Sequence, residues 1–332
     1  MISKRKGSLK NFTGYCLFGA DRLRPLLRSL SREIEGVREA KDIEFIHRMR
    51  VASRRIRSCL PLFEECFPPK KYRDWRKEIR NITRALREAR DADVQIAFLK
   101  AYTEKLKEES LRPGAQRFLL RLRQRRERTQ PRVIEAIDRL HESGVAEDME
   151  KLCRKMRKGR AEVNSPKIYQ KAIVHITTRL DEIFAHEASV YIPENIKEHH
   201  AMRIAVKRLR YTMEVFSPLY EEELENQLLV CKKLQDMLGD LHDCDVWMEY
   251  LPQFMDDERA YSLDYFGQDD SFGILEPGLL HFQQHLRERR SAIYEEFVAY
   301  WKDIQEQNIW NDTKQFIQLT FDEKSKNQAK VK

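Results

Sequence analysis

The sequence repeats itself once, at a spacing of about 150 residues. The segment HRMRVASRRIRSCLPLF at residues 47–63 returns as HAMRIAVKRLRYTMEVF at residues 200–216. Two further matches follow in the same order, RDADV at residue 90 with HDCDV at residue 242, and LRQRR at residue 122 with LRERR at residue 286. A repeat this long exceeds the unit of a solenoid and indicates a duplicated domain half. We therefore expect two halves, residues 1–160 and 161–310, with a polar tail at 311–332.

Each half contains four segments in which apolar residues recur every three or four positions, as in amphipathic helices. The segments are 15–39, 43–66, 70–105 and 114–141, then 166–190, 194–217, 220–254 and 276–308. Pro and Gly fall between them, for example in FPPK at residue 67 and EPG at residue 276, and strand-like alternation is absent. Residues 142–163 are typical of a basic helical linker. The expected fold class is all-α, with two four-helix halves.

Composition supports an ordered chain of long helices. Hydrophobic residues make up 41%, charged residues 35%, and there are only 11 Gly and 11 Pro in 332 residues. No apolar run approaches the ~20 residues that span a bilayer. The six cysteines show no CxxC spacing, so we expect a reduced, cytoplasmic chain. They are Cys16, Cys59, Cys66, Cys153, Cys231 and Cys244.

The net charge of +8 conceals a strong asymmetry between the halves. Residues 1–160 hold 42 Lys and Arg against 23 Asp and Glu, a balance of +19, whereas residues 161–332 hold 20 against 31, a balance of −11. An excess of positive charge in one half indicates a polyanionic partner, whether nucleic acid, a phosphate polymer or an anionic membrane.

The repeated motif places its two residue types on opposite sides of a helix. At 100° per residue, Met49, Ala52 and Ile56 share one face, and the basic residues lie opposite or beside them. In the first copy these are His47, Arg50, Arg54, Arg57 and, at the flank, Arg55. In the second copy they are His200, Arg203, Lys207, Arg210 and, at the flank, Arg208.

The next helix of the first half carries a further cationic row, opposite Tyr72, Trp75 and Ile79. The row consists of Arg73, Lys77, Arg80, Arg84 and Arg87, and Asp91 closes it; in the second half it is reduced to Lys232 and Lys233. Such rows are often solvated faces. However, like charges three or four residues apart destabilise a helix by about 0.2–0.5 kcal/mol per pair, and the duplication kept them in place. We therefore interpret the basic faces as ligand-binding surfaces.

Arg126 and Arg290 fall inside the apolar stripes of the helices over 114–141 and 276–308. A buried guanidinium needs an anionic partner, because an unpaired buried charge costs several kcal/mol. Two partners are open: a bound polyanion, or an internal carboxylate. The candidate carboxylates are Asp91, Asp93, Asp243 and Asp245.

The motif H-x-M-R-[VI]-A-x-[RK]-R-[IL]-R, followed by [RH]-D-x-D-V and occurring twice, resembles the CHAD family of conserved-histidine α-helical domains. The resemblance covers residues 10–308 and implies two four-helix bundles related by pseudo-twofold symmetry around a basic central channel. It also implies that inorganic polyphosphate binds there without catalysis, with no metal or cofactor. Polyphosphate-metabolising enzymes or granules would be further partners. Nucleic acid is not an expected partner.

With this resemblance, the candidate polyphosphate-binding residues come from both copies and their neighbouring helices. They are His47, Arg50, Arg54, Arg55, Arg57, Arg80, Arg84, Arg87, Arg126, His200, Arg203, Lys207, Arg208, Arg210, Lys232 and Arg290. The chain departs from the family pattern at Arg87, where the family has Gly, as the second copy does at Gly239. An E-x-E-x-K motif of a tunnel-type triphosphatase is absent, so we expect a stand-alone binding module.

Two other function classes compete with this interpretation. The pair His242–Asp243 is similar to part of the metal site of HD-type phosphohydrolases, but such a site needs further His and Asp ligands, and Arg90 replaces His242 in the other copy. A nucleic-acid binder would use aromatic stacking platforms. We expect Tyr72, Trp75 and Phe63 on core faces instead.

Overall fold

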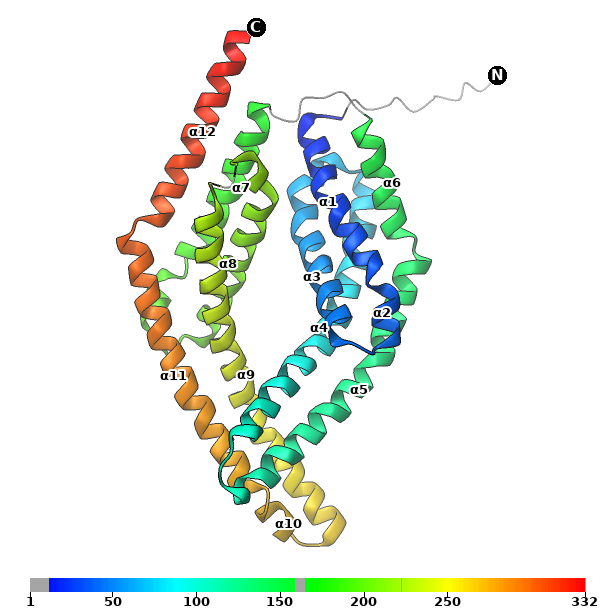
Figure 1. Ribbon diagram of the computed structural model, residues 1–332, viewed down its shortest axis with the longest axis vertical. Coiled ribbons are helices and arrows are strands. Elements are labelled where there is room, and N and C mark those ends of the chain that lie inside the picture. The colour runs from blue at the N-terminus through cyan, green and yellow to red at the C-terminus, as the bar shows by residue number, and fades with distance from the viewer. Residues whose placement is uncertain (1–11, 159–164, 222, 332) are drawn as a thin grey trace.

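The computed structural model describes residues 12–158, 165–221 and 223–331, and within these ranges the chain consists of helices and their connections without strands (Figure 1). The fold class is therefore all-α, as the sequence predicted. The first half contains α1 (Gly14–Arg32), α2 (Ile34–Glu39), α3 (Ile43–Cys59), α4 (Pro69–Lys105), α5 (Arg112–Glu142) and α6 (Val145–Arg157). The second contains α7 (Pro166–Phe184), α8 (Ile196–Phe216), α9 (Glu225–Phe266), α10 (Asp270–Gly273), α11 (Glu276–Glu306) and α12 (Ile309–Val331).

The expected helical segments differ from the observed ones mainly at their ends. Segment 43–66 is α3 followed by a 3-10 helix, η1 (Leu60–Cys66), and segment 166–190 likewise divides into α7 and η3 (Glu187–Tyr191). Segment 220–254 is longer than expected, since α9 continues to Phe266. The boundary placed between residues 160 and 161 lies outside the described residues.

Two segments expected as a linker and a tail are packed helices. Within 142–163, α6 packs against α1 through Met149, Cys153 and Met156, which recur every three or four residues and are buried. In the expected polar tail, α12 packs against α7, and Thr313 and Ile317 are buried. Each half thus holds a fifth long helix. Their packing was not predicted, because the average composition of each segment is polar and its apolar stripe is narrow.

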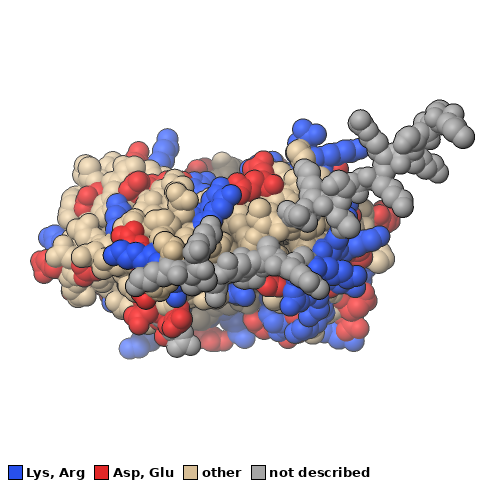
Figure 2. Space-filling view, turned by 90° about the horizontal axis from the view of Figure 1, so that it is seen from above, with Lys and Arg blue, Asp and Glu red and all other residues tan. Residues whose placement is uncertain are grey.

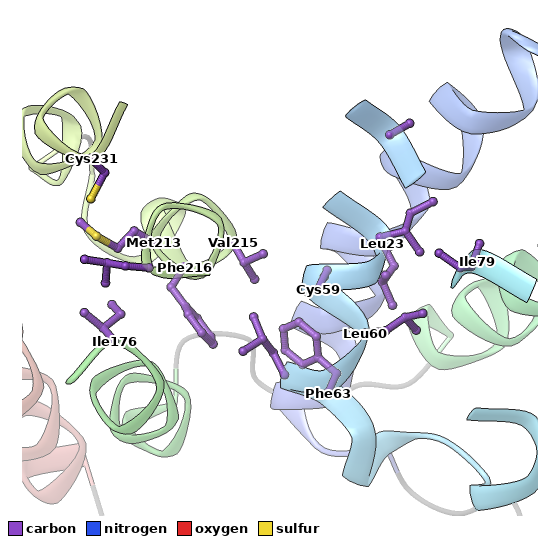
Figure 3. Close-up of a cluster of buried hydrophobic side chains, with 14 of the residues drawn as sticks. Leu23, Cys59, Leu60, Phe63, Ile79, Ile176, Met213, Val215, Phe216 and Cys231 are labelled. Carbon is purple, nitrogen blue, oxygen red and sulfur yellow. The ribbon is translucent and has the colours of Figure 1, made fainter. Parts of the chain in front are cut away.

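In the upper part of Figure 1, helices of the first half and helices of the second half share one hydrophobic core. Side chains from α1, α3, α7 and α8 belong to a single buried cluster. At the contact, the Phe63 ring lies 6.2 Å from that of Phe216, and the Phe18 ring stacks on Phe216 at 5.9 Å. Figure 3 shows Val215 and Phe216 of α8 on one side of this contact and Phe63 of η1 on the other. Because apolar surfaces meet here, α3 and α8 are held together at their carboxyl ends.

The hairpins α4–α5 and α9–α11 cross below this core and bury a second hydrophobic cluster (Figure 1). At the crossing the backbones of α5 and α11 nearly touch. A Cβ at Gly114 would lie 2.2 Å from the Leu275 carbonyl oxygen, and one at Gly278 would lie 2.1 Å from the Leu111 carbonyl oxygen. Only glycine allows this approach. The RPG and EPG segments therefore serve as a crossing point in addition to beginning a helix.

Cys16 of α1 and Cys66 of η1 form a disulfide, with their Cα atoms 5.3 Å apart. The expectation of reduced cysteines is therefore wrong for this pair, because the fold brings together thiols that are 50 residues apart and carry no spacing signal. Cys59, Cys153, Cys231 and Cys244 are free and buried. None of the described helices is long and apolar enough to cross a bilayer.

Candidate functional site

The helices α3 and α8 each turn an apolar face to the core and a basic face away from it. Asp42 caps α3, where its Oδ1 accepts a hydrogen bond from the Glu44 backbone N–H at 2.8 Å. Met49, Ala52 and Ile56 are buried, as are Met202, Ala205 and Leu209, which confirms the predicted core faces. The two helices are in contact, and the charges of Arg54 and Arg50 on α3 act on Lys207 of α8, so the basic faces lie near each other.

Five cations from both halves act on one another and are here called the central basic cluster. They are Arg50 and Arg54 of α3, Arg87 of α4, and Arg203 and Lys207 of α8. Burial and the charges of Arg54, Arg203, Arg50 and Arg87 lower the pKa of Lys207 to about 7. Burial and Arg54 likewise lower the pKa of Arg50 to about 10, although Asp91 opposes this shift. The cluster therefore holds more positive charge than its neighbours neutralise.

Several nitrogen atoms in and beside the cluster have no hydrogen-bond partner among the described residues. They include the Nε atoms of Arg50 and Arg203 and the Nδ1 atom of His200, all of which are buried. A buried donor without a partner costs about 1–3 kcal/mol. The guanidinium carbon of Arg54 lies 5.5 Å from the centroid of the neutral Tyr211 ring. These buried nitrogen atoms therefore have hydrogen-bonding capacity that the described residues do not use.

The repeated D-x-D motif faces two directions. Residues two apart on a helix point about 200° apart, so the aspartates of each motif reach different neighbours. Asp91 lies 3.4 Å from Arg50 and also pairs with Arg87. Asp93 points the other way, toward α5. The first aspartate thus belongs to the basic face and the second to the interior.

Arg126 and Arg290 pair with the second aspartate of each motif. Arg126 Nε donates to Asp93 Oδ1 at 2.7 Å, and its side chain is 14% exposed. Arg290 Nε donates to Asp245, and its NH2 donates to the Pro193 carbonyl at 2.9 Å. Both thus form internal ion pairs, the alternative that the sequence left open, and these pairs tie α5 to α4 and α11 to α9.

Three further candidates form ion pairs with glutamates, each of which is shared between two arginines. Glu214 accepts from Arg210 at 3.0 Å and pairs with Arg55 of the other half at 3.3 Å. Arg208 lies 3.5 Å from Glu182. The flanking arginines therefore join helices, and they contribute less free charge than the central basic cluster.

An exposed α4 cationic row continues from the cluster along the first half. It consists of Arg73, Arg76, Lys77, Arg80 and Arg84. In the described part of the chain, the α4 cations that form salt bridges are Lys71, Arg87 and Lys100, and none of these five does so. The Arg57 side chain of α3 is exposed. Partial burial and the charges of Arg80 and Arg76 lower its pKa, so Arg57 lies near the row. Lys232 lies apart from the row, in a groove between α9 and α11.

The histidines border the cluster. Burial and nearby arginines lower the pKa of His47 and of His200. The His200 ring lies 4.1 Å, centroid to centroid, from that of His242, whose pKa is lowered to about 4 by burial, by His200 and by cluster cations. Within the described ranges, no group of three or more His, Cys, Asp or Glu side chains could hold a metal ion. The HD-type interpretation gains no support from this geometry.

Sequence reasoning missed some residues near the site. Tyr211 lies under both Arg54 and Arg210, and it directly follows the repeated motif, where an aromatic residue could have been noticed. His242 was considered only as a metal ligand. The aromatic residues Phe63, Tyr72 and Trp75 are buried, as predicted, and are not available for stacking.

Surface charge follows the same asymmetry as the sequence. Seen from above, blue side chains gather over the group of helices that contains α1 and α6, while red side chains are more evenly interspersed over the group with α7 and α12 (Figure 2). The last turn of α6 contains three basic residues, Arg154, Lys155 and Arg157. The first half thus carries the broader basic surface.

Residues 21–252 match the family model of the CHAD domain. Among solved structures, the chain is similar to the CHAD domain from the plant Ricinus communis, with 21% identity, a TM-score of 0.55, and coverage of 86% of this chain and 93% of that one. It is also similar to PptA from Streptomyces chartreusis, with 16% identity, a TM-score of 0.55, and coverage of 85% and 99%. No curated protein sequence matches.

Proposed function

The chain belongs to the CHAD family, and we propose that its central basic cluster binds inorganic polyphosphate without catalysing a reaction. The observation that carries this proposal is the convergence of cations from α3, α4 and α8 on Lys207, whose pKa falls to about 7. Mutual repulsion of these cations is relieved when an anion with many charges lies among them.

Polyphosphate suits the cluster because it offers a linear array of charges and no bases. Arginine can grip phosphate oxygens with two parallel hydrogen bonds, whereas lysine acts as a point charge. The unpaired Nε atoms of Arg50 and Arg203 can take up this role. A nucleic-acid strand would gain less, because Phe63, Tyr72 and Trp75 are buried and Tyr211 is covered by arginine.

The proposed path of the polymer follows the duplication. We place a channel between the basic faces of α3 and α8, related by pseudo-twofold symmetry, with the α4 cationic row as its extension in the first half. The corresponding site residues are His47, Arg50, Arg54, Arg57, Arg80, Arg84, Arg87, His200, Arg203 and Lys207. Polyphosphate-metabolising enzymes and granules are partners consistent with such a site.

Calorimetric titration with polyphosphates of defined length tests the proposal. Long chains should bind tightly and in a salt-sensitive manner, because each engaged phosphate releases counterions. Orthophosphate and pyrophosphate should bind far more weakly. An affinity that does not change with ionic strength would refute the proposal, as would competition by orthophosphate at equal phosphate concentration.

A further inference from the structure

A pocket in the second half adjoins the central basic cluster. It lies between the first turns of α8 and the middle of α9, has a volume of about 530 Å³, and is here called the histidine pocket. Its lining residues are Ile196, Lys197, His200, His242, Asp245, Val246, Met248 and Glu249. This volume falls in the range of small-molecule sites, about 300–1,000 Å³.

The pocket and the cluster share a wall. His200 lines the pocket, and Arg203 follows it by three residues, about 4.5 Å along the helix axis. The charges of Arg203, Arg87 and Lys207 all lower the pKa of His242, so they act across the same wall. A ligand could therefore occupy the pocket with one end and the cluster with the other.

The chemistry of the pocket differs from that of the cluster. Its two imidazoles lie 4.1 Å apart, and with a pKa of about 4 His242 is neutral at pH 7. Neutral imidazole rings serve proteins as stacking surfaces for nucleic-acid bases. Ile196, Val246 and Met248 add apolar walls. Such a pocket suits a flat, uncharged ring.

The charges in the pocket lining nearly cancel, unlike those of the cluster. Asp245 is held by Arg290, and the exposed Glu249 is offset by Lys197. The pocket therefore attracts a phosphate chain less than the cluster does, and the Glu249 carboxylate can accept a hydrogen bond from the amino group of a base. The row of phosphates would therefore end at His200.

The equivalent place in the first half lacks these features. Ile43 and Val94 keep the apolar walls and are 45% and 40% exposed. However, Arg90 stands where the second half has His242, and Ala97 where it has Glu249. The paired rings and the free carboxylate are therefore specific to the second half.

We propose that the histidine pocket binds the base of a nucleoside oligophosphate whose phosphates lie on the central basic cluster. This inference rests on the phosphate-binding role proposed for that cluster. The base would stack against His200 and His242, and an amino group such as that of adenine would donate to Glu249.

The test compares adenosine 5′-triphosphate with tripolyphosphate by calorimetry, at equal ionic strength and with EDTA present. Both ligands carry three phosphates and tripolyphosphate has the greater negative charge, so tighter binding of adenosine triphosphate reports the nucleoside. We expect adenosine triphosphate to bind about tenfold more tightly, because stacking of one base usually contributes roughly 5- to 150-fold.

Two matched variants locate the effect. Val246→Trp should fill the pocket and remove the advantage of adenosine triphosphate, while the affinity for tripolyphosphate stays within about twofold. Val94→Trp, at the equivalent position of the first half, should leave both affinities unchanged. Equal binding of the two ligands to the unmodified protein would overturn the inference, as would an equal loss for both in Val246→Trp.

The outcome separates this inference from the proposed function. If long polyphosphate binds but the nucleoside gives no advantage, only the histidine pocket has been misassigned. If adenosine triphosphate binds and polyphosphate does not, the polymer proposal fails while the pocket stands. If neither binds, both are wrong.

Discussion

The helices α4 and α9 occupy equivalent places in the sequence repeat but present different surfaces. The α4 cationic row and Arg87 correspond, 152 positions later, to Glu225, Leu228, Leu229, Lys232, Asp236 and Gly239. Only Arg80 keeps a cation at the matching position, Lys232. By contrast, α3 and α8 keep the same basic face. The shared face is where the two halves meet, so we infer that duplication preserved the joint site and let the outer surfaces diverge.

The pair Arg87 and Gly239 shows how this divergence affects the site. Arg87 adds a fifth cation to the central basic cluster and lies 3.2 Å from Asp91. Gly239 adds no charge and leaves space beside Arg203, whose Nε would lie 3.6 Å from a Cβ at that position. One half therefore contributes more charge, and the other gives its arginine more room.

The largest expected effect is structural and should be the same in both halves. Arg126→Met and Arg290→Met each remove one partner of a buried ion pair and leave Asp93 or Asp245 uncompensated. Each should lower the free energy of unfolding by about 3–5 kcal/mol, measured by urea denaturation. Arg132→Met is the control, because this side chain is 74% exposed and should cost less than about 1 kcal/mol. Stability unchanged in either variant would show that these arginines face the ligand.

These two arginines also show how far sequence reasoning reaches. Their place in an apolar stripe was visible in the sequence, as was the need for an anionic partner. Which aspartate each one meets depends on the rotation of α4 and α9 about their axes. The 200° separation within D-x-D requires only that the two carboxylates face different ways. The packing of α5 and α11 then decides that the second one is internal.

Other features depended on contacts that one sequence does not reveal. The core faces of α3 and α8 followed from periodicity and are confirmed. The packing of α6 and α12 was missed, because their apolar stripes are narrow and most of their residues are polar. The disulfide between Cys16 and Cys66 has no local signature. Glu214 pairs with Arg210 in its own helix and with Arg55 of the other half, and the second pair depends on the contact between the halves.

The α4 cationic row allows a test of whether α4 and α9 contribute differently to polyphosphate affinity. Replacing Lys77, Arg80 and Arg84 together by Gln should weaken long-chain polyphosphate about 10- to 100-fold. The slope of log affinity against log salt should fall by about two, since a phosphate contact on a flexible single strand contributes roughly 0.7. Lys232→Gln combined with Lys233→Gln is the matched control in α9 and should change affinity less than threefold. Equal losses in both variants would mean that the two outer surfaces are equivalent.

The titration of Lys207 sharpens the account of the shared face. Its pKa of about 7 in the free protein should rise when phosphate lies beside it, so binding takes up a proton between about pH 7 and 9. Affinity should therefore fall as pH rises through this range, by at most about tenfold per pH unit, and Lys207 itself should add no pH dependence below about pH 6. Calorimetry at pH 8 in two buffers of different ionisation enthalpy measures this uptake. Lys207→Arg should abolish it; uptake that persists in that variant would assign the proton to another group.

The smallest expected effect concerns Gly239. A Cβ there would make ordinary van der Waals contact with Arg203, at 3.6 Å, and alanine is favoured over glycine inside a helix. Gly239→Ala should therefore stabilise the protein by about 0.5–1 kcal/mol in thermal melts, without changing polyphosphate affinity. A clear loss of affinity would show that Arg203 needs the full space beside α9.

The central claim is that both halves form one site, and the stoichiometry of binding tests it most directly. A short polyphosphate of about ten units is titrated into the unmodified protein, Arg50→Glu, Arg203→Glu and the double variant, with helicity checked by circular dichroism. The account predicts one binding event per chain, weakened by either substitution, and coupled losses in the double variant, because Arg50 and Arg203 act on the same ligand. Two independent events, each removed by only one substitution, would contradict it.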